Sequence, residues 1–258
     1  MRVLFWVTLS ALLTVGTPAF AHFGMIVPKD NLVTKDGPKE VALDIRFWHP
    51  MENNGMNMEK PALDVVDRGK KQDISNALAP RTVDGKQTWT AKYAVSGPGV
   101  FAFAVTPKPY WEGVEDHYIV HLSKTIVSAF GDEEGWDRPV GLKMEIVPMV
   151  KPFALYAGNV FTGKVLYKGK PLPNCRVEVE FFNKDGRVKA PTEAYVTQTV
   201  TTDASGVFTY GAPWAGWWGF AALTTDDVTL KKDGQDKNVE IGGILWTYFH
   251  PVPSGVRQ

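Results

Sequence analysis

The chain has 258 residues, with 28 Lys and Arg against 28 Asp and Glu, and it is 44% hydrophobic and 12% aromatic. A formal net charge of +0 argues against a nucleic-acid-binding protein, because that class needs an excess of basic side chains to neutralise phosphates. The apolar content is high enough to build a core and excludes a disordered chain. The 24 Gly and 18 Pro favour short strands joined by turns over long helices.

Residues 1–21 have the layout of a secretory signal peptide. Arg2 precedes an apolar stretch at 3–16, and the sequence AFA at 19–21 is a small-x-small cleavage site. The apolar stretch is shorter than the about 20 residues that a membrane-spanning helix needs. A core helix is the alternative, but no amphipathic period supports it. We expect cleavage after Ala21, a mature chain that begins at His22, and a periplasmic location.

Strand patterns dominate the first half of the mature chain. Alternation of apolar and polar residues, or a short apolar run ended by a turn, predicts a strand. Such patterns occur at 41–48, 88–95, 100–105, 118–127 and 142–147. One stretch, 64–78, could instead be helical, although its charge and weak period argue against a helix. The strands and turns together predict an antiparallel sandwich.

A second strand pattern follows a short Pro-bounded linker at 148–152. Its strands are expected at 158–166, 177–182 and 207–210, separated by Gly-containing turns typical of hairpins. This half resembles a prealbumin-like or carboxypeptidase-regulatory-like sandwich. The predicted fold is therefore all-β, with two antiparallel β-sandwich domains at 22–149 and 150–258 after the signal peptide.

Three tryptophans in the segment 213–220 admit two interpretations. An exposed aromatic platform formed by Trp214, Trp217 and Trp218 could stack on sugar rings. Core packing is favoured, because neighbouring residues such as Trp217 and Trp218 point to opposite faces of a strand. One of the two can still be exposed.

His22 is the most informative candidate ligand. At the mature N-terminus it would carry a free α-amine and an imidazole on one residue, and together these can chelate a transition metal. Both groups are largely unprotonated near neutral pH. Nitrogen donors of this kind suit Cu²⁺ or Ni²⁺.

His49 opens a second candidate segment. The loop 49–61 contains this imidazole, three methionines including Met56 and Met58, and carboxylates including Glu52. Methionine thioethers are soft ligands, and we include all four named side chains in the candidate metal site. The alternative is that the methionines fold back over the end of a sandwich as packing residues.

The other three histidines differ in their expected roles. His117 and His121 lie in a strand pattern, where they would share a face but stand about 13 Å apart at ~3.3 Å per residue. At most one of them can therefore join His22, and we assign His121 to the site. Nearby carboxylates, Glu112 among them, could hold a ligand imidazole in its tautomer. His250 follows an apolar run and is interpreted as structural.

No catalytic signature is visible in the sequence. A nucleophile elbow, an HExxH motif and a P-loop are all missing, and the single cysteine, Cys175, has no evident catalytic partner. With no second cysteine it also cannot form an intramolecular disulfide. We therefore do not expect an enzyme.

Several long segments of the mature chain resemble the DUF4198 family. They are AHFGMIVP at 21–28, HPMENNGMNMEKP at 49–61, PYWEGVEDHYIVHLSKTIV at 109–127, GDEEGWDRPVGLKMEIVP at 131–148 and PWAGWWGFAAL at 213–223. Members of that family include the periplasmic component of nickel/cobalt uptake systems of the energy-coupling-factor type. The resemblance implies a periplasmic protein that captures Ni²⁺ or Co²⁺ and presents the ion to a membrane uptake transporter.

Two other functions remain open at this point. An N-terminal histidine facing a second histidine on a β-sandwich is also the copper-brace arrangement, which would make the protein a copper oxidase or a copper chaperone. The tryptophan-rich strand would instead suit a carbohydrate-binding or adhesion protein.

Overall fold

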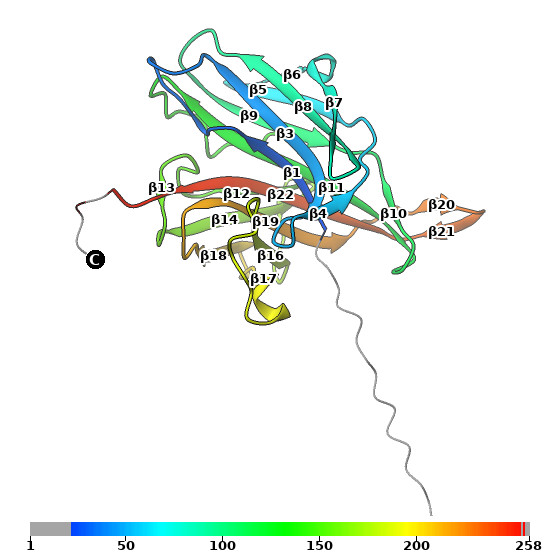
Figure 1. Ribbon diagram of the computed structural model, residues 1–258. Coiled ribbons are helices and arrows are strands. Elements are labelled where there is room, and N and C mark those ends of the chain that lie inside the picture. Colours follow the sequence, from blue (N-terminus) through cyan, green and yellow to red (C-terminus); the bar gives the residue numbers. More distant parts are fainter. Residues whose placement is uncertain (1–21, 254, 256–258) are drawn as a thin grey trace, which may run out of the picture.

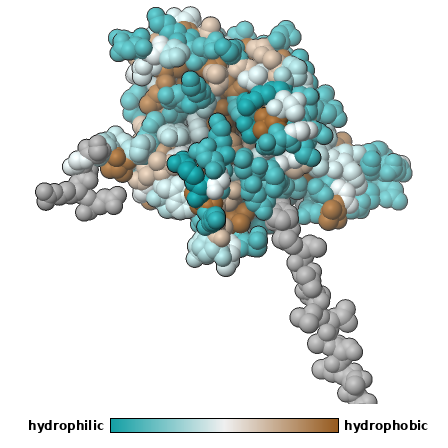
Figure 2. Space-filling view, viewed as in Figure 1, coloured by the Kyte–Doolittle hydropathy of each residue, from teal (hydrophilic) through white to brown (hydrophobic). Residues whose placement is uncertain are grey.

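The structure is a computed structural model that describes residues 22–253 and residue 255. The expected signal peptide lies outside the described residues. Within them the fold is all-β, as predicted, and the helical content is two 3₁₀ turns, η1 (Ser75–Ala77) and η2 (Glu193–Tyr195). No helix in this described part of the chain is long and apolar enough to cross a membrane. The face shown in Figure 2 is mostly hydrophilic, with apolar residues in small separate patches.

A long central sheet lies between two smaller outer sheets (Figure 1). The first outer sheet has the order β1 (Phe23–Pro28), β3 (Glu40–His49), β8 (Lys86–Ala94) and β7 (Ala79–Val83), and β4 (Asn54–Met56) pairs with β3. The second contains β12 (Met144–Pro148), β14 (Val160–Tyr167), β15 (Lys170–Pro171) and β18 (Val207–Gly211).

The central sheet is formed from both halves of the chain. Its order is β17 (Gln198–Thr201), β16 (Arg176–Phe181), β19 (Gly216–Thr225), β22 (Val239–His250), β11 (His117–Ala129), β9 (Gly99–Thr106), β5 (Ala62–Asp67) and β6 (Lys70–Asp73). Three short strands pair at its sides: β2 (Leu32–Val33), β10 (Tyr110–Glu112) and β13 (Leu155–Tyr156). A separate hairpin of β20 (Leu230–Lys232) and β21 (Gln235–Lys237) projects from the body (Figure 1).

The strand β22 joins the two halves. It runs parallel to β11 and pairs with it from Tyr118 opposite Val239 to Thr125 opposite Trp246. The central sheet is therefore continuous across the predicted domain boundary between residues 149 and 150. The division into two domains stays a prediction, and what the structure shows is two sandwiches that share this sheet.

The residues of the central sheet alternate between two hydrophobic cores. Trp217 packs against the core beneath the first outer sheet, whereas Trp218 is buried in the core above the second. This confirms that the two indoles point to opposite faces. The helical alternative for 64–78 is wrong, because this segment contains the end of β5, β6 and η1. Leu63 and Val65 are buried on alternate positions of β5, a period of two that fits a strand.

A buried ion pair lies in the second core. Lys124 on β11 contacts Glu145 on β12, with Nζ 2.5 Å from Oε1 and both side chains 1% exposed. Glu145 also accepts backbone N–H bonds from Val140, Gly141 and Leu142. Burial lowers the pKa of the Lys124 ammonium, and the Glu145 carboxylate opposes that shift. The pair therefore fastens the loop before β12 to the central sheet.

Candidate metal centre

His22 and His49 come together through the pairing of β1 with β3. In this antiparallel register Phe23 lies opposite Trp48, so the next position outward places His22 opposite His49. Their ring centroids are 4.6 Å apart, with an angle of 50° between the planes. One ion bound about 2 Å from a nitrogen of each ring, at right angles, would place two imidazole centroids about 4.5 Å apart. The observed pair fits that arrangement.

His121 faces this pair from the central sheet. Its ring lies 5.8 Å from the ring of Phe47, which also stacks on His22 at 5.4 Å. Two glycines make room for it. A Cβ on Gly242 would lie 2.6 Å from Cδ2 of His121, and a Cβ on Gly24 would lie 2.9 Å from its carbonyl oxygen. A larger residue at position 24 or 242 would therefore clash with His121.

Glu240 fixes the tautomer of His121. The Nε2 of His121 lies 3.2 Å from Oε1 of Glu240. Burial opposes ionisation of Glu240, but the bond to His121 and the nearby imidazoles outweigh it and lower the pKa of this carboxyl. An ionised carboxylate can only accept, so Nε2 carries a proton, and in the neutral imidazole Nδ1 then holds the lone pair. Nδ1 is buried and has no hydrogen-bond partner among the described residues. A lone pair left free in this way suits a metal ligand.

Glu112 contacts the imidazole of His22, as Glu240 contacts that of His121. Its Oε2 lies 3.4 Å from Nε2 of His22, and the His22 side chain is 15% exposed. The other ring nitrogen, Nδ1, is the one that can close a six-membered chelate ring with the α-amine of the same residue. Burial, followed by the charges of His49 and His121, lowers the pKa of His22 to about 3. The imidazole is therefore neutral at pH 7, the form that binds metals.

His117 and His250 occupy different surroundings. Nε2 of His117 is 3.5 Å from Oε2 of Glu115 and has no hydrogen-bond partner among the described residues. This ring lowers the pKa of His22 less than His121 does. His250 contacts Asn31 and Tyr248, which places it in a different environment from the cluster.

The loop residues predicted as ligands are mostly packing or peripheral residues. Met58 is 5% exposed and belongs to the first core, and Met56 packs against that core opposite Phe47. Met58 also lines a cavity of about 420 Å³ together with Phe47, Tyr110 and His121. Burial and the neighbouring Glu193 raise the pKa of Glu52. These contacts give Met56, Met58 and Glu52 no described link to His22.

The turn after His49 is fastened to β16. The backbone N–H of Met51 donates to Oε2 of Glu180, and Nδ2 of Asn183 donates to the Met51 carbonyl. The Thr197 hydroxyl donates to the other oxygen of Glu180. Burial raises the pKa of Glu180 to about 8, even though the hydrogen bonds from Thr197 and Met51 to this carboxyl lower it.

We expect Glu180 to make a contribution to the stability of the apoprotein that falls as pH rises from 4.5 to 8, because folded Glu180 keeps a proton that the unfolded chain releases near 4.5. Its contribution to the free energy of unfolding should drop by about 2–4 kcal/mol over that window. In the Glu180→Gln variant this part of the pH dependence should vanish. Urea unfolding at pH 5, 6.5 and 8 measures it, and equal pH slopes in variant and native protein would contradict it.

Sequence reasoning missed Glu240. The residue lies 119 positions from His121, and only the parallel pairing of β11 with β22 brings the two together. One signal was present: Glu240 is the single charged residue among the apolar and small residues of 239–245. A carboxylate inside a buried strand requires a partner.

The side chains alone do not form a complete ligand set. Among the described residues, no group of three or more His, Cys, Asp or Glu side chains is placed to hold a metal ion. The pair His22–His49, with His121 beyond Phe47, therefore supplies imidazoles but needs a further donor. The α-amine expected on His22 is a donor of that kind.

Fold and geometry define an all-β protein of two sandwiches on a shared sheet, with a histidine cluster at one end of the first. The chain belongs to the DUF4198 family, a domain of unknown function, which matches residues 19–226. No curated protein matches the sequence.

Three solved structures resemble the chain weakly. The D0-D1 domain of intimin is 14% identical, with 86% of this chain and 99% of that chain covered and a TM-score of 0.26. A two-domain fibronectin type-III segment of chicken tenascin is 13% identical, with 88% and 100% covered and a TM-score of 0.24. A putative carbohydrate binding protein from Bacteroides uniformis is 10% identical, with 88% and 97% covered and a TM-score of 0.22.

Proposed function

We propose that the mature protein binds one Ni²⁺ or Co²⁺ ion in the periplasm and delivers it to a membrane uptake transporter. The observation that supports this most directly is the contact of His22 with His49, 4.6 Å between ring centroids, at the position where signal cleavage would expose an α-amine. The proposed donors are that amine, Nδ1 of His22 and the ring of His49. Nδ1 of His121 is the candidate fourth donor.

The charges around the cluster favour a cation. Glu112 and Glu240 lie against the imidazoles of His22 and His121, where carboxylates orient a ligand ring and raise its basicity. Three or four nitrogen donors leave further positions of a six-coordinate ion to water. Replaceable water ligands allow the ion to be transferred, whereas a closed four-ligand site would retain it.

A copper protein is the second candidate, because the same nitrogen donors suit Cu²⁺. The His22–His49 contact favours it as much as it favours nickel. A copper oxidase would consume a reductant and oxidise a substrate only when loaded with copper. A carrier loaded with any of these ions would show no such turnover, and we infer a carrier because the sequence contains no recognised catalytic motif.

Calorimetry with Ni²⁺, Co²⁺ and Cu²⁺ on the mature chain tests the proposal. We expect one Ni²⁺ or Co²⁺ ion to bind per chain. His49→Ala should abolish tight binding, and His250→Ala is the matched control that should leave it unchanged. Anomalous scattering at the nickel edge should place the ion between His22 and His49.

Delivery needs a separate measurement. Nickel uptake by cells that lack the protein should be restored by the native chain and not by His49→Ala. Absence of any ion-dependent heat would contradict metal binding. Tight binding without an effect on uptake would contradict the carrier role, and copper-dependent turnover would favour the oxidase.

A further inference from the structure

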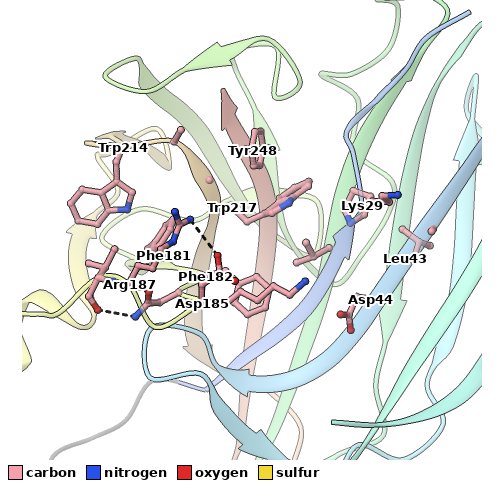
Figure 3. Close-up of a pocket in the computed structure, with 18 of the residues that line it drawn as sticks. Lys29, Leu43, Asp44, Phe181, Phe182, Asp185, Arg187, Trp214, Trp217 and Tyr248 are labelled. Atoms are coloured by element: carbon pink, nitrogen blue, oxygen red, sulfur yellow. Dashed lines mark hydrogen bonds and ion pairs between the residues drawn. The ribbon is translucent and has the colours of Figure 1, made fainter. Parts of the chain in front are cut away.

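A second cavity lies between the first outer sheet and the segment that follows β16, away from the histidine cluster. Its volume is about 650 Å³. One wall is formed by the end of β1 and by β3, with Lys29, Leu43 and Asp44, and the other by the segment 181–188 after β16 (Figure 3). Trp217 and Tyr248 lie between these walls on β19 and β22 (Figure 3). We call this cavity the aromatic groove.

Five aromatic residues are among those that line this groove. Trp217 packs edge-on against Tyr248, with centroids 5.4 Å apart, and Trp214 packs edge-on against Phe181 at 5.7 Å. Trp214 is 37% exposed. The structure therefore separates the three tryptophans of this segment. Trp218 is a core residue, Trp217 lies inside the groove, and Trp214, which also packs on Trp218 with centroids 5.3 Å apart, lines its rim. Two indoles at different places along the groove can stack on two rings of one ligand.

The walls are held in place by hydrogen bonds and by a close approach. Asn183 donates to the carbonyls of Met51 and Val188 and accepts from the Val188 N–H, so its amide fixes the segment 181–188. A Cβ on Gly216 would lie 2.5 Å from the Phe181 ring, so only glycine lets β19 begin beneath that ring. A preformed groove loses little entropy when a ligand binds.

The groove carries a surplus of positive charge, unlike the metal centre. Four cationic side chains line it against two carboxylates: Lys29, Arg81, Lys184 and Arg187 against Asp44 and Asp185. Both carboxylates are already paired, Asp44 with Arg46 and Arg81, and Asp185 with Arg187. Lys29 and Lys184 are exposed, lie on opposite walls and form no ion pair with any described residue. The ligand that complements this lining is an anion.

We propose that the aromatic groove binds an acidic oligosaccharide, with sugar rings stacked on Trp214 and Trp217 and carboxylates paired with Lys29 and Lys184. The volume lies within the roughly 300–1,000 Å³ of small-molecule sites, which is far more than a hydrated ion requires. Sugar rings combine an apolar face with a polar edge, as this lining demands. A peptide strand would need an open sheet edge, and β1, the edge strand beside the groove, is buried along its length.

The test measures tryptophan fluorescence and calorimetry of the mature chain with tetragalacturonate as the probe. Saturable binding is expected, at least about tenfold tighter than the binding of neutral maltotetraose or of a tetraglutamate peptide. The Lys29→Gln/Lys184→Gln variant should lose at least tenfold in affinity. Its matched control is Lys39→Gln/Lys70→Gln, which removes two exposed charges elsewhere and should bind like the native chain.

The aromatic contribution is measured with Trp214→Ala, whose side chain is partly exposed, and circular dichroism checks that the variant is folded. At least a tenfold loss is expected, and His49→Ala should bind the sugar normally because this site is independent of the metal centre. No binding of tetragalacturonate would overturn the proposal. Equal binding of maltotetraose would overturn the role of the lysines, and equal binding of tetraglutamate would overturn stacking on the indoles.

Discussion

A mature chain that starts at Ala19 instead of His22 should bind Ni²⁺ at least about 100-fold more weakly, a loss of about 2.7 kcal/mol. In that chain the nitrogen of His22 belongs to a peptide bond, so it cannot donate a lone pair as an amine does. The amine and Nδ1 of His22 then no longer close a chelate ring. Calorimetric titration of the two chains at pH 7.5 measures the difference.

Three added residues make a cleaner comparison than one or two. With His22 at the second or third position, the new amine and the intervening backbone amides could form a replacement chelate. With His22 at the fourth position, these donors can no longer form such a chelate. The extended chain should keep its fold, because β1 begins at Phe23, after His22. Equal affinity of both chains would remove the α-amine from the site and with it the proposed mode of binding.

His22→Ala gives the complementary result. This variant keeps an α-amine but loses the imidazole, so it should also lose at least about 100-fold in affinity. A metal site built on His49 and His121 alone would tolerate both changes. The two variants therefore separate a chelating N-terminus from a site that merely lies near it, and excess EDTA should reverse the ion-dependent change in the native chain.

Several of the longer strands of this fold could be predicted from local patterns. The alternation at 41–48 becomes part of β3 (Glu40–His49), and the run at 100–105 lies within β9 (Gly99–Thr106). A period of two is enough to identify such strands because one face of each is buried. The expected strand at 142–147 begins two residues late, because the N–H of Leu142 bonds to the Glu145 side chain instead of to a neighbouring strand.

Local sequence patterns could not predict which distant strands pair. The sequence placed His22 and His49 in separate segments, and only the register of β1 on β3 shows that they are opposite each other. The same limit hid Glu240, which reaches His121 through a parallel pairing across the two halves. Periodicity tells which face a residue occupies and not which strand lies beside it.

The methionine loop shows a different limit. Met56 and Met58 lie in a polar sequence, which left both a ligand role and a packing role open, and Met58 is buried in the first core. The backbone explains this: the N–H of Met58 bonds to the Gln87 carbonyl, which draws the loop across the end of the sheet. Such a contact between residues 29 positions apart leaves no trace in local composition.

Replacement of either member of the buried pair Lys124–Glu145 should destabilise the protein strongly. Removing one partner of a buried ion pair leaves an uncompensated charge and costs about 3–5 kcal/mol. We expect Lys124→Met at the lower end, because Glu145 would still accept three backbone N–H bonds. Glu145→Leu should reach the upper end, since it leaves a buried ammonium together with three unpaired N–H groups.

Urea unfolding of the metal-free protein, followed by tryptophan fluorescence, measures both costs. Leu122→Met is the matched control, because Leu122 lies on the same face of β11 in the same core, and a volume-conserving change there should cost less than about 1.5 kcal/mol. The double variant Lys124→Met/Glu145→Leu should be more stable than Glu145→Leu, because it no longer buries a lone ammonium. It should still be less stable than the native chain, because the three N–H groups stay unpaired. Lys124 points away from the face that carries His121, so folded Lys124→Met should bind Ni²⁺ as the native chain does. If both variants lose no more free energy of unfolding than Leu122→Met does, the ion pair contributes little to the attachment of the loop.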